Sequence, residues 1–145
     1  MVYLIDMYRF YLITYLIIIF PLFSFSHDYN LGTLMIDHPK IIKNTNHAKG
    51  YMNITNNGEN EVYLIGGKPF FSKGLILHKD DLSNSYEMLI VDKIKIPAGA
   101  KVSFKDLNLH LMFLDYDKNL EWFEPHKATL YFSNDTELEV EFDLE

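Results

Sequence analysis

Two histidines and two methionines, spread over 35 positions, are the residues of this chain best suited to metal chemistry. They are His78, Met88, His110 and Met112. His110 and Met112 lie inside the apolar run 107–114, where an extended strand places residues two apart on the same face. His78 and Met88 flank the polar, turn-prone stretch 80–85, which predicts that they face each other across a hairpin. Imidazole and thioether donors together suit one soft ion, copper(I).

The elements that must position these residues are short strands separated by turn signals. The expected strands cover residues 33–37, 50–55, 61–65, 75–78, 86–91, 101–104, 108–114, 127–132 and 137–142. In the last of them, Leu138, Val140 and Phe142 alternate with acidic residues, which indicates one buried and one solvent-exposed face. The pattern predicts an all-β fold: a single antiparallel Greek-key β-sandwich, cupredoxin-like or immunoglobulin-like, in one domain spanning residues 27–145.

Composition excludes several classes of function. The formal net charge is −7, and Arg9 is the only arginine, so the domain lacks the positive field and the fork-shaped donors that nucleic-acid backbones require. The chain has no cysteine, which rules out disulfides, cysteine-ligated zinc, iron–sulfur clusters and a thiolate blue-copper centre. Soft metal binding would therefore depend on methionine and histidine.

The N-terminal segment has the pattern of a targeting signal. An uncharged apolar run covers residues 10–25 and follows Arg9, and Ser24 and Ser26 supply the small residues of a cleavage site before His27. The sequence thus predicts a signal peptide at residues 1–26 and an exported domain. The alternative is an uncleaved anchor, although this run is shorter than the roughly 20 residues that span a bilayer. The membrane would be contacted only through this segment.

Several stretches resemble the periplasmic copper(I) chaperones of the PCuAC family. They are Ile36-Asp37-His38-Pro39, residues 48–56, Ile96-Pro97-Ala98-Gly99 and Leu109-His110-Leu111-Met112. The family carries a metal motif of the form His, about ten residues, Met, twenty-one residues, His-x-Met. Here nine residues separate His78 from Met88 and twenty-one separate Met88 from His110. The first interval is thus one residue shorter than the family pattern.

This resemblance implies that the domain binds copper(I) through the four residues above and delivers it to a cuproprotein. The implied recipient is the copper centre of a cytochrome c oxidase subunit, with a Sco-type thiol protein as a further partner. A structural or adhesion-type exported sandwich without a metal is the alternative. An enzyme is not expected, since no nucleophile–base pair or paired-carboxylate motif is recognisable.

Other candidate residues have simpler interpretations. Asp80 and Asp81 could orient an imidazole, but the favoured interpretation is that they are solvated turn residues. His38, His47 and His126 are expected to be surface or hydrogen-bonded core residues. Met35 and Met52 are expected to pack in the core. The expected ligand set therefore remains His78, Met88, His110 and Met112.

Overall fold

The computed structural model describes residues 28–45, 47–81, 87–116, 119, 121 and 124–145. This part of the chain forms eleven strands and contains no helix. The strands are β1 (Tyr29–Leu31), β2 (Leu34–Lys43), β3 (His47–Asn56), β4 (Val62–Pro69), β5 (Gly74–Asp81), β6 (Glu87–Ile90), β7 (Ile94–Ile96), β8 (Ala100–Ser103), β9 (Leu109–Leu114), β10 (His126–Phe132) and β11 (Glu137–Leu144). The predicted all-β class is confirmed.

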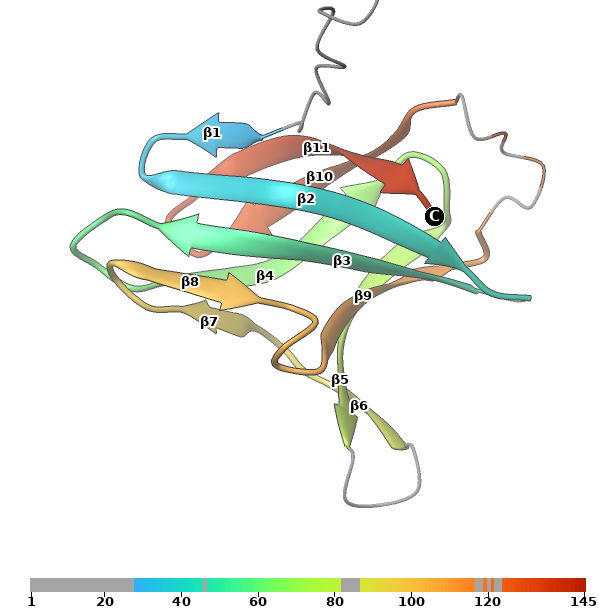
Figure 1. The fold of residues 1–145 in the computed structure, drawn as a ribbon, viewed down its shortest axis with the longest axis horizontal. Coiled ribbons are helices and arrows are strands. Elements are labelled where there is room, and N and C mark those ends of the chain that lie inside the picture. The colour runs from blue at the N-terminus through green and yellow to red at the C-terminus, as the bar shows by residue number, and fades with distance from the viewer. Residues whose placement is uncertain (1–27, 46, 82–86, 117–118, 120, 122–123) are drawn as a thin grey trace, which may run out of the picture.

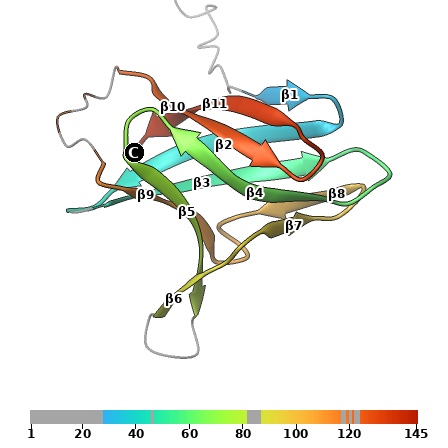
Figure 2. The ribbon, with the colours of Figure 1, turned by 180° about the vertical axis from the view of Figure 1, so that it is seen from behind.

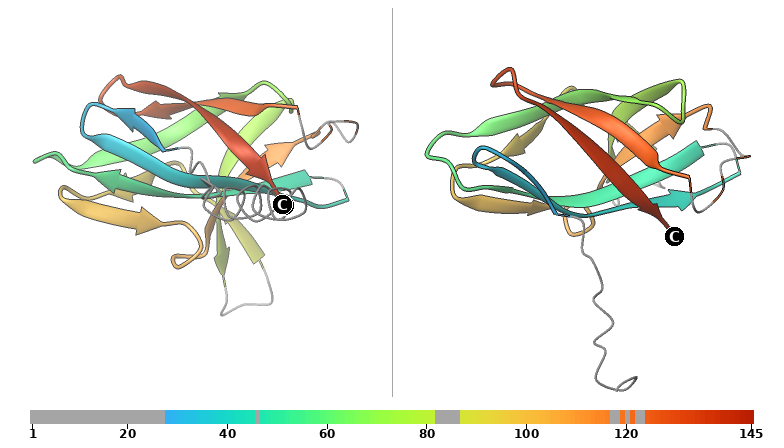
Figure 3. Two further views of the ribbon diagram at one scale, coloured as in Figure 1. Left: turned by 45° about the horizontal axis from the view of Figure 1, so that its top comes forward. Right: turned by 90° about the horizontal axis from the view of Figure 1, so that it is seen from above.

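Two layers of strands face each other and are joined along one side (Figure 1). The first layer has the order β6-β5-β9-β3-β2, with β1 paired to β2 and β8 paired to β3, and the second has the order β11-β10-β4-β7. Strand β11 pairs with β10 in its own layer and with β2 in the other, so the sheet curls round on itself. Figure 3 shows β11 running diagonally to β2 and β3.

One pair of neighbouring strands departs from the predicted antiparallel arrangement. Strands β2 and β11 run parallel, with Asp143 opposite Lys40 and Leu144 opposite Ile41. Every other strand pair in the described part of the chain is antiparallel. This parallel pair joins the two layers, because β2 belongs to the first layer and β11 to the second.

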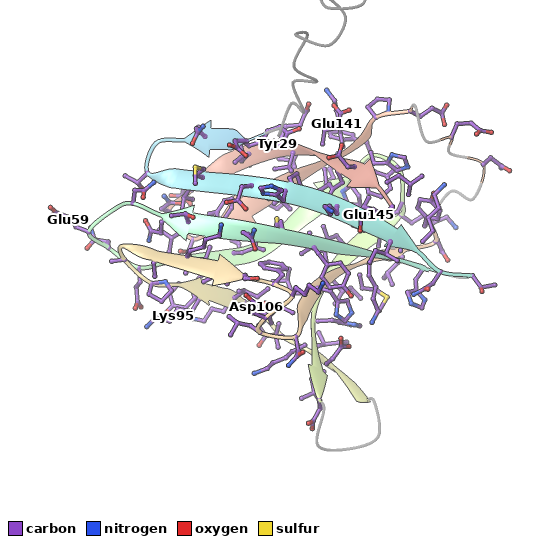
Figure 4. The ribbon with its side chains drawn as sticks, in the orientation of Figure 1. Tyr29, Glu59, Lys95, Asp106, Glu141 and Glu145 are labelled. Carbon is purple, nitrogen blue, oxygen red and sulfur yellow. The ribbon has the colours of Figure 1, made fainter. Side chains whose placement is uncertain are left out.

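The hydrophobic core fills the space between the two layers. Its largest fully buried side chains are aromatic: Phe104, Phe113, Phe132 and Phe142. In β11, Val140 and Phe142 are buried while Glu139 and Glu141 are exposed, as the alternation predicts. The Tyr29 hydroxyl fastens β1 to this strand, because it donates to the Glu141 carbonyl at 3.3 Å and accepts from the Glu141 N–H at 3.0 Å (Figure 4).

All of the predicted strands are present, with ends shifted by a few residues, and two further strands were not predicted. Strands β1 and β7 have only three residues each, which is too short for a reliable alternation pattern. The expected signal peptide at residues 1–26 lies outside the described residues. Within the described part, no helix is long and apolar enough to cross a membrane.

Strand β9 is held by features at both ends and in the middle. Asn108 precedes it with φ +56° and Asp115 follows it with φ +47°, conformations that short polar side chains tolerate better than most residues. Next to it, Gly50 of β3 lies opposite Leu111, and a side chain there would have its Cβ 2.7 Å from the Phe113 ring. The absence of that Cβ allows β3 and β9 to pack closely.

Candidate metal site

The structure places three of the four predicted ligands on one face of neighbouring strands. His78 of β5 lies directly opposite His110 of β9, and Ile76 lies opposite Met112. Because directly opposed residues of antiparallel strands share a face, His78, His110 and Met112 lie on the same side of the sheet. Strands β5 and β9 run side by side in the view from behind (Figure 2).

This face points away from the hydrophobic core, yet its residues are buried. The exposed fraction is 8 % for His78, 0 % for His110 and 5 % for Met112. The alternate residues Leu109, Leu111 and Phe113 belong to the core cluster, whereas Met112 does not. Met112 is therefore buried but lies outside the hydrophobic core. Met52, in contrast, is part of the core, as predicted.

The imidazole nitrogens of both histidines lack hydrogen-bond partners. Nδ1 and Nε2 of His78 and of His110 are inaccessible to solvent, and none has a partner within hydrogen-bond distance among the described residues. A buried polar atom without a partner costs about 1–3 kcal/mol, so folded proteins seldom keep such groups without a reason. Four such atoms in two adjacent rings indicate a site built to bind a ligand.

The relative placement of the two rings fits a shared metal ion. Their centroids are 5.3 Å apart and their planes meet at 80°. With metal–nitrogen bonds of about 2 Å, each ring centroid lies about 3 Å from the ion, so two ligating rings have centroids at most about 6 Å apart. The observed spacing lies inside that limit, and Met112 adds a thioether two residues along β9.

Burial also keeps both imidazoles in the form that binds metals. It lowers the pKa of His110 to about 4, and the Lys49 ammonium contributes to this shift. It also lowers the pKa of His78, although the nearby Asp80 carboxylate opposes that change. Both rings are therefore neutral at pH 7, with one nitrogen lone pair each available to a metal.

Met88 lies on the strand that neighbours His78. The predicted β5–β6 hairpin is present, with Met88 opposite Asp80 and Ile90 opposite His78. Met88 therefore lies across the hairpin from His78, as expected, but two residues away from the position directly opposite it. His78 is instead flanked by Ile90 and His110. The side chain of Met88 lies outside the described part of the structure.

Three residues that the sequence did not single out as ligands surround His110. Asp80 Oδ2 is 3.6 Å from its Nδ1, and Asp80 Oδ1 is 3.6 Å from Lys49 Nζ. The rings of Tyr51 and His110 have centroids 6.2 Å apart. The sequence indicates Asp80 as a possible orienting residue. Lys49 and Tyr51 come from β3, whose pairing with β9 no local pattern reveals.

The other histidines of the described residues are His38, His47 and His126. The side chain of His38 is 61 % exposed, and Nε2 of His47 is 3.3 Å from the Asn44 amide nitrogen. His126 is 1 % exposed and packs against Phe71, with ring centroids 5.4 Å apart. Its ring is hydrogen-bonded to the backbone of Glu124, as expected for a core histidine, whereas its Nε2 has no hydrogen-bond partner among the described residues.

The donor types favour a soft ion over a hard one. Within the described residues, no group of three or more His, Cys, Asp or Glu side chains is placed to hold a metal. A site formed by these residues therefore depends on thioether sulfur in addition to imidazole, and that combination suits copper(I).

An open groove lies beside the site. Its volume is about 540 Å³, and Asp80 and Tyr51, which both lie next to His110, form part of its wall. Asp106 and Glu145, labelled in Figure 4, also line it. His110 is therefore buried beneath residues that themselves border an accessible depression.

Solved structures with a similar architecture include PCuAC domains. The copper-bound PCuAC domain from PmoF2 is 22 % identical, with a TM-score of 0.69 over 82 % of this chain and 97 % of that one. The apo PCuAC domain from PmoF1 is 23 % identical, with a TM-score of 0.70 over 82 % and 98 %. Copper(I)-bound DR1885 from Deinococcus radiodurans is 17 % identical, with a TM-score of 0.61 over 84 % and 81 %. The chain thus has the PCuAC fold.

A family model places the chain in a sequence family as well. The model described as "Putative lipoprotein LpqE-like" matches residues 34–144, which is nearly all of the described domain. The chain belongs to the LpqE-like family. No curated protein sequence matches it.

Proposed function

We propose that this protein is a copper(I) carrier that binds the ion through His78, His110 and Met112, with Met88 as the fourth ligand. The observation that carries the proposal is the pair of buried, facing imidazoles whose nitrogens have no partner among the described residues. The copper-bound state of two proteins with this fold supports it. We propose no catalytic role.

The chemistry of the donors explains why such a site would suit a carrier. Thioether sulfur has no proton to lose, and both imidazoles are neutral, so binding requires no proton release at pH 7. Neutral ligands leave the positive charge of the ion uncompensated, which favours moderate affinity over permanent storage.

We further propose that the carrier acts outside the cytoplasm, in the periplasm, and delivers copper to a cuproprotein. The description of its family as lipoproteins and the apolar N-terminal segment support export, with cleavage near Ser26 or retention as an anchor. The proposed recipient is the copper centre of a cytochrome c oxidase subunit, with a Sco-type thiol protein as a second partner. The absence of cysteine fits an oxidising compartment, since a Met/His site cannot be lost to disulfide formation.

The test is a competitive titration of the protein with copper(I) against a chelator of known affinity, without oxygen. We expect one copper(I) per chain, and loss of that binding in the double variant H110L/M112L, which keeps the volume of both side chains. H38A/M35L, which removes a histidine and a methionine elsewhere, should bind like the native protein. Equal copper(I) affinity of H110L/M112L and the native protein would show that the ion binds elsewhere.

A further inference from the structure

The carboxylate of Asp80 lies between two charged or polar partners next to the candidate metal site. Its Oδ2 is 3.6 Å from His110 Nδ1, and its Oδ1 is 3.6 Å from Lys49 Nζ. Both distances are within ion-pair range and slightly beyond hydrogen-bond range. The side chain of Asp80 is 32 % exposed, whereas that of His110 is completely buried.

The backbone of Asp80 is fixed from both sides. Its N–H donates to the Asn108 carbonyl at 2.8 Å, and Met88 lies opposite it on β6. Asp80 follows His78 by two residues, so pleating puts both side chains on the face that holds His110. The register of the strands, and not a loop, thus positions the Asp80 carboxylate next to the His110 imidazole.

A neutral imidazole carries its proton on either Nδ1 or Nε2, and its surroundings decide which. Since the negative Asp80 oxygen faces Nδ1 of His110, a proton on that nitrogen is favoured, and a lone pair on it is repelled. A metal-binding histidine commonly donates its second ring N–H to a carboxylate, and this contact fixes both tautomer and ring orientation. Here His110 is the candidate metal-binding histidine, and the Asp80 carboxylate faces its second ring nitrogen, Nδ1.

We propose that Asp80 is a positioning residue that holds His110 in the Nδ1–H tautomer and leaves its Nε2 as the donor to copper(I). Lys49 keeps the carboxylate in place through its contact with Oδ1. The effect on metal affinity rests on the proposed copper function, whereas the tautomer is a property of the metal-free protein. His78 has no equivalent contact with a carboxylate among the described residues.

The experiment is long-range ¹⁵N–¹H NMR of the metal-free, ¹⁵N-labelled protein at pH 7.5, which reports the tautomer of each histidine. We expect a single Nδ1–H tautomer at His110 in the native protein. In D80A this histidine should become a mixture or switch to Nε2–H. D80E retains the carboxylate and should keep the native pattern, as should D81A, which removes an equal charge one residue away.

Copper(I) titration of the same variants measures the consequence. Loss of a partner of this kind commonly lowers metal affinity by about 10- to 100-fold, which is the effect expected for D80A and not for D80E or D81A. An unchanged His110 tautomer together with unchanged affinity in D80A would overturn the positioning role. Failure of the native protein to bind copper(I) would instead overturn the proposed function, and the NMR result would still decide the role of Asp80.

Discussion

Replacement of His110 by leucine should make the metal-free protein more stable, although most substitutions of fully buried residues destabilise. His110 is 0 % exposed, and both its ring nitrogens lack hydrogen-bond partners among the described residues. Leucine needs no such partners and is of roughly similar size. The variant H110L therefore removes an unfavourable term from the folded state and adds apolar burial.

The magnitude follows mainly from Nε2, which has no partner among the described residues, because Nδ1 faces the Asp80 carboxylate. An unsatisfied buried polar atom costs about 1–3 kcal/mol, and the altered shape of the side chain costs up to about 1.5 kcal/mol. The net gain in free energy of unfolding is then up to about 3 kcal/mol at pH 7.5. Asp80 loses a neighbour but is partly exposed and keeps its contact with Lys49, so its own cost is small.

Urea unfolding of metal-free native protein and H110L, followed by circular dichroism, measures this difference. The slope with urea should be the same for both proteins, so that a shift of the midpoint reports stability alone. A decrease in the free energy of unfolding of H110L by more than about 1 kcal/mol would refute the reasoning, because it would show that the ring nitrogens are satisfied in the folded protein.

Three further predictions concern the same region. The stability of the native protein relative to H110L should fall further as the pH decreases from 6.5 to 4: the unfolded imidazole takes up a proton near pH 6.5, whereas the folded one, with its pKa of about 4, does not. This decrease in the free energy of unfolding relative to H110L approaches about 3 kcal/mol and levels off below pH 4. Urea unfolding of both proteins at several pH values measures it. A difference in free energy of unfolding that stays constant with pH would show that His110 titrates normally. M112L should change the free energy of unfolding by less than about 1.5 kcal/mol but weaken copper(I) binding at least about tenfold; chelator competition measures this, and unchanged affinity would remove Met112 from the ligand set. G50A should lower the free energy of unfolding by about 1–3 kcal/mol, because its Cβ would lie 2.7 Å from the Phe113 ring. G74A, whose Cβ would be 3.7 Å from Leu114, should be nearly neutral in thermal unfolding. Equal melting temperatures of the two variants would contradict the close packing of β3 on β9.

The fold was largely predictable because its strands alternate in polarity. Residues 137–142 show that alternation in the sequence and in the burial of β11. His110 and Met112 could be paired from the sequence because pleating alone puts residues two apart on one face. The alternation of a strand and the shared face of residues two apart depend only on neighbouring residues, so the sequence predicts both.

What the sequence did not reveal depends on pairing between distant strands. His78 lies opposite His110 only because β5 pairs with β9, across a separation that includes β6, β7 and β8. The approach of Lys49 and Tyr51 to His110 depends on the pairing of β3 with β9. The parallel contact of β2 with β11 joins the two ends of the domain and has no sequence signature of its own.

X-ray absorption at the copper edge of the copper(I)-loaded protein tests the central claim most directly. We expect both imidazole nitrogen and thioether sulfur as neighbours of one copper ion. M112L should lose the part of the sulfur scattering that Met112 supplies, with Met88 supplying the rest, whereas M35L should keep the native spectrum. A copper(I) environment of nitrogen and oxygen atoms without sulfur, or a spectrum of M112L identical to that of the native protein, would contradict it.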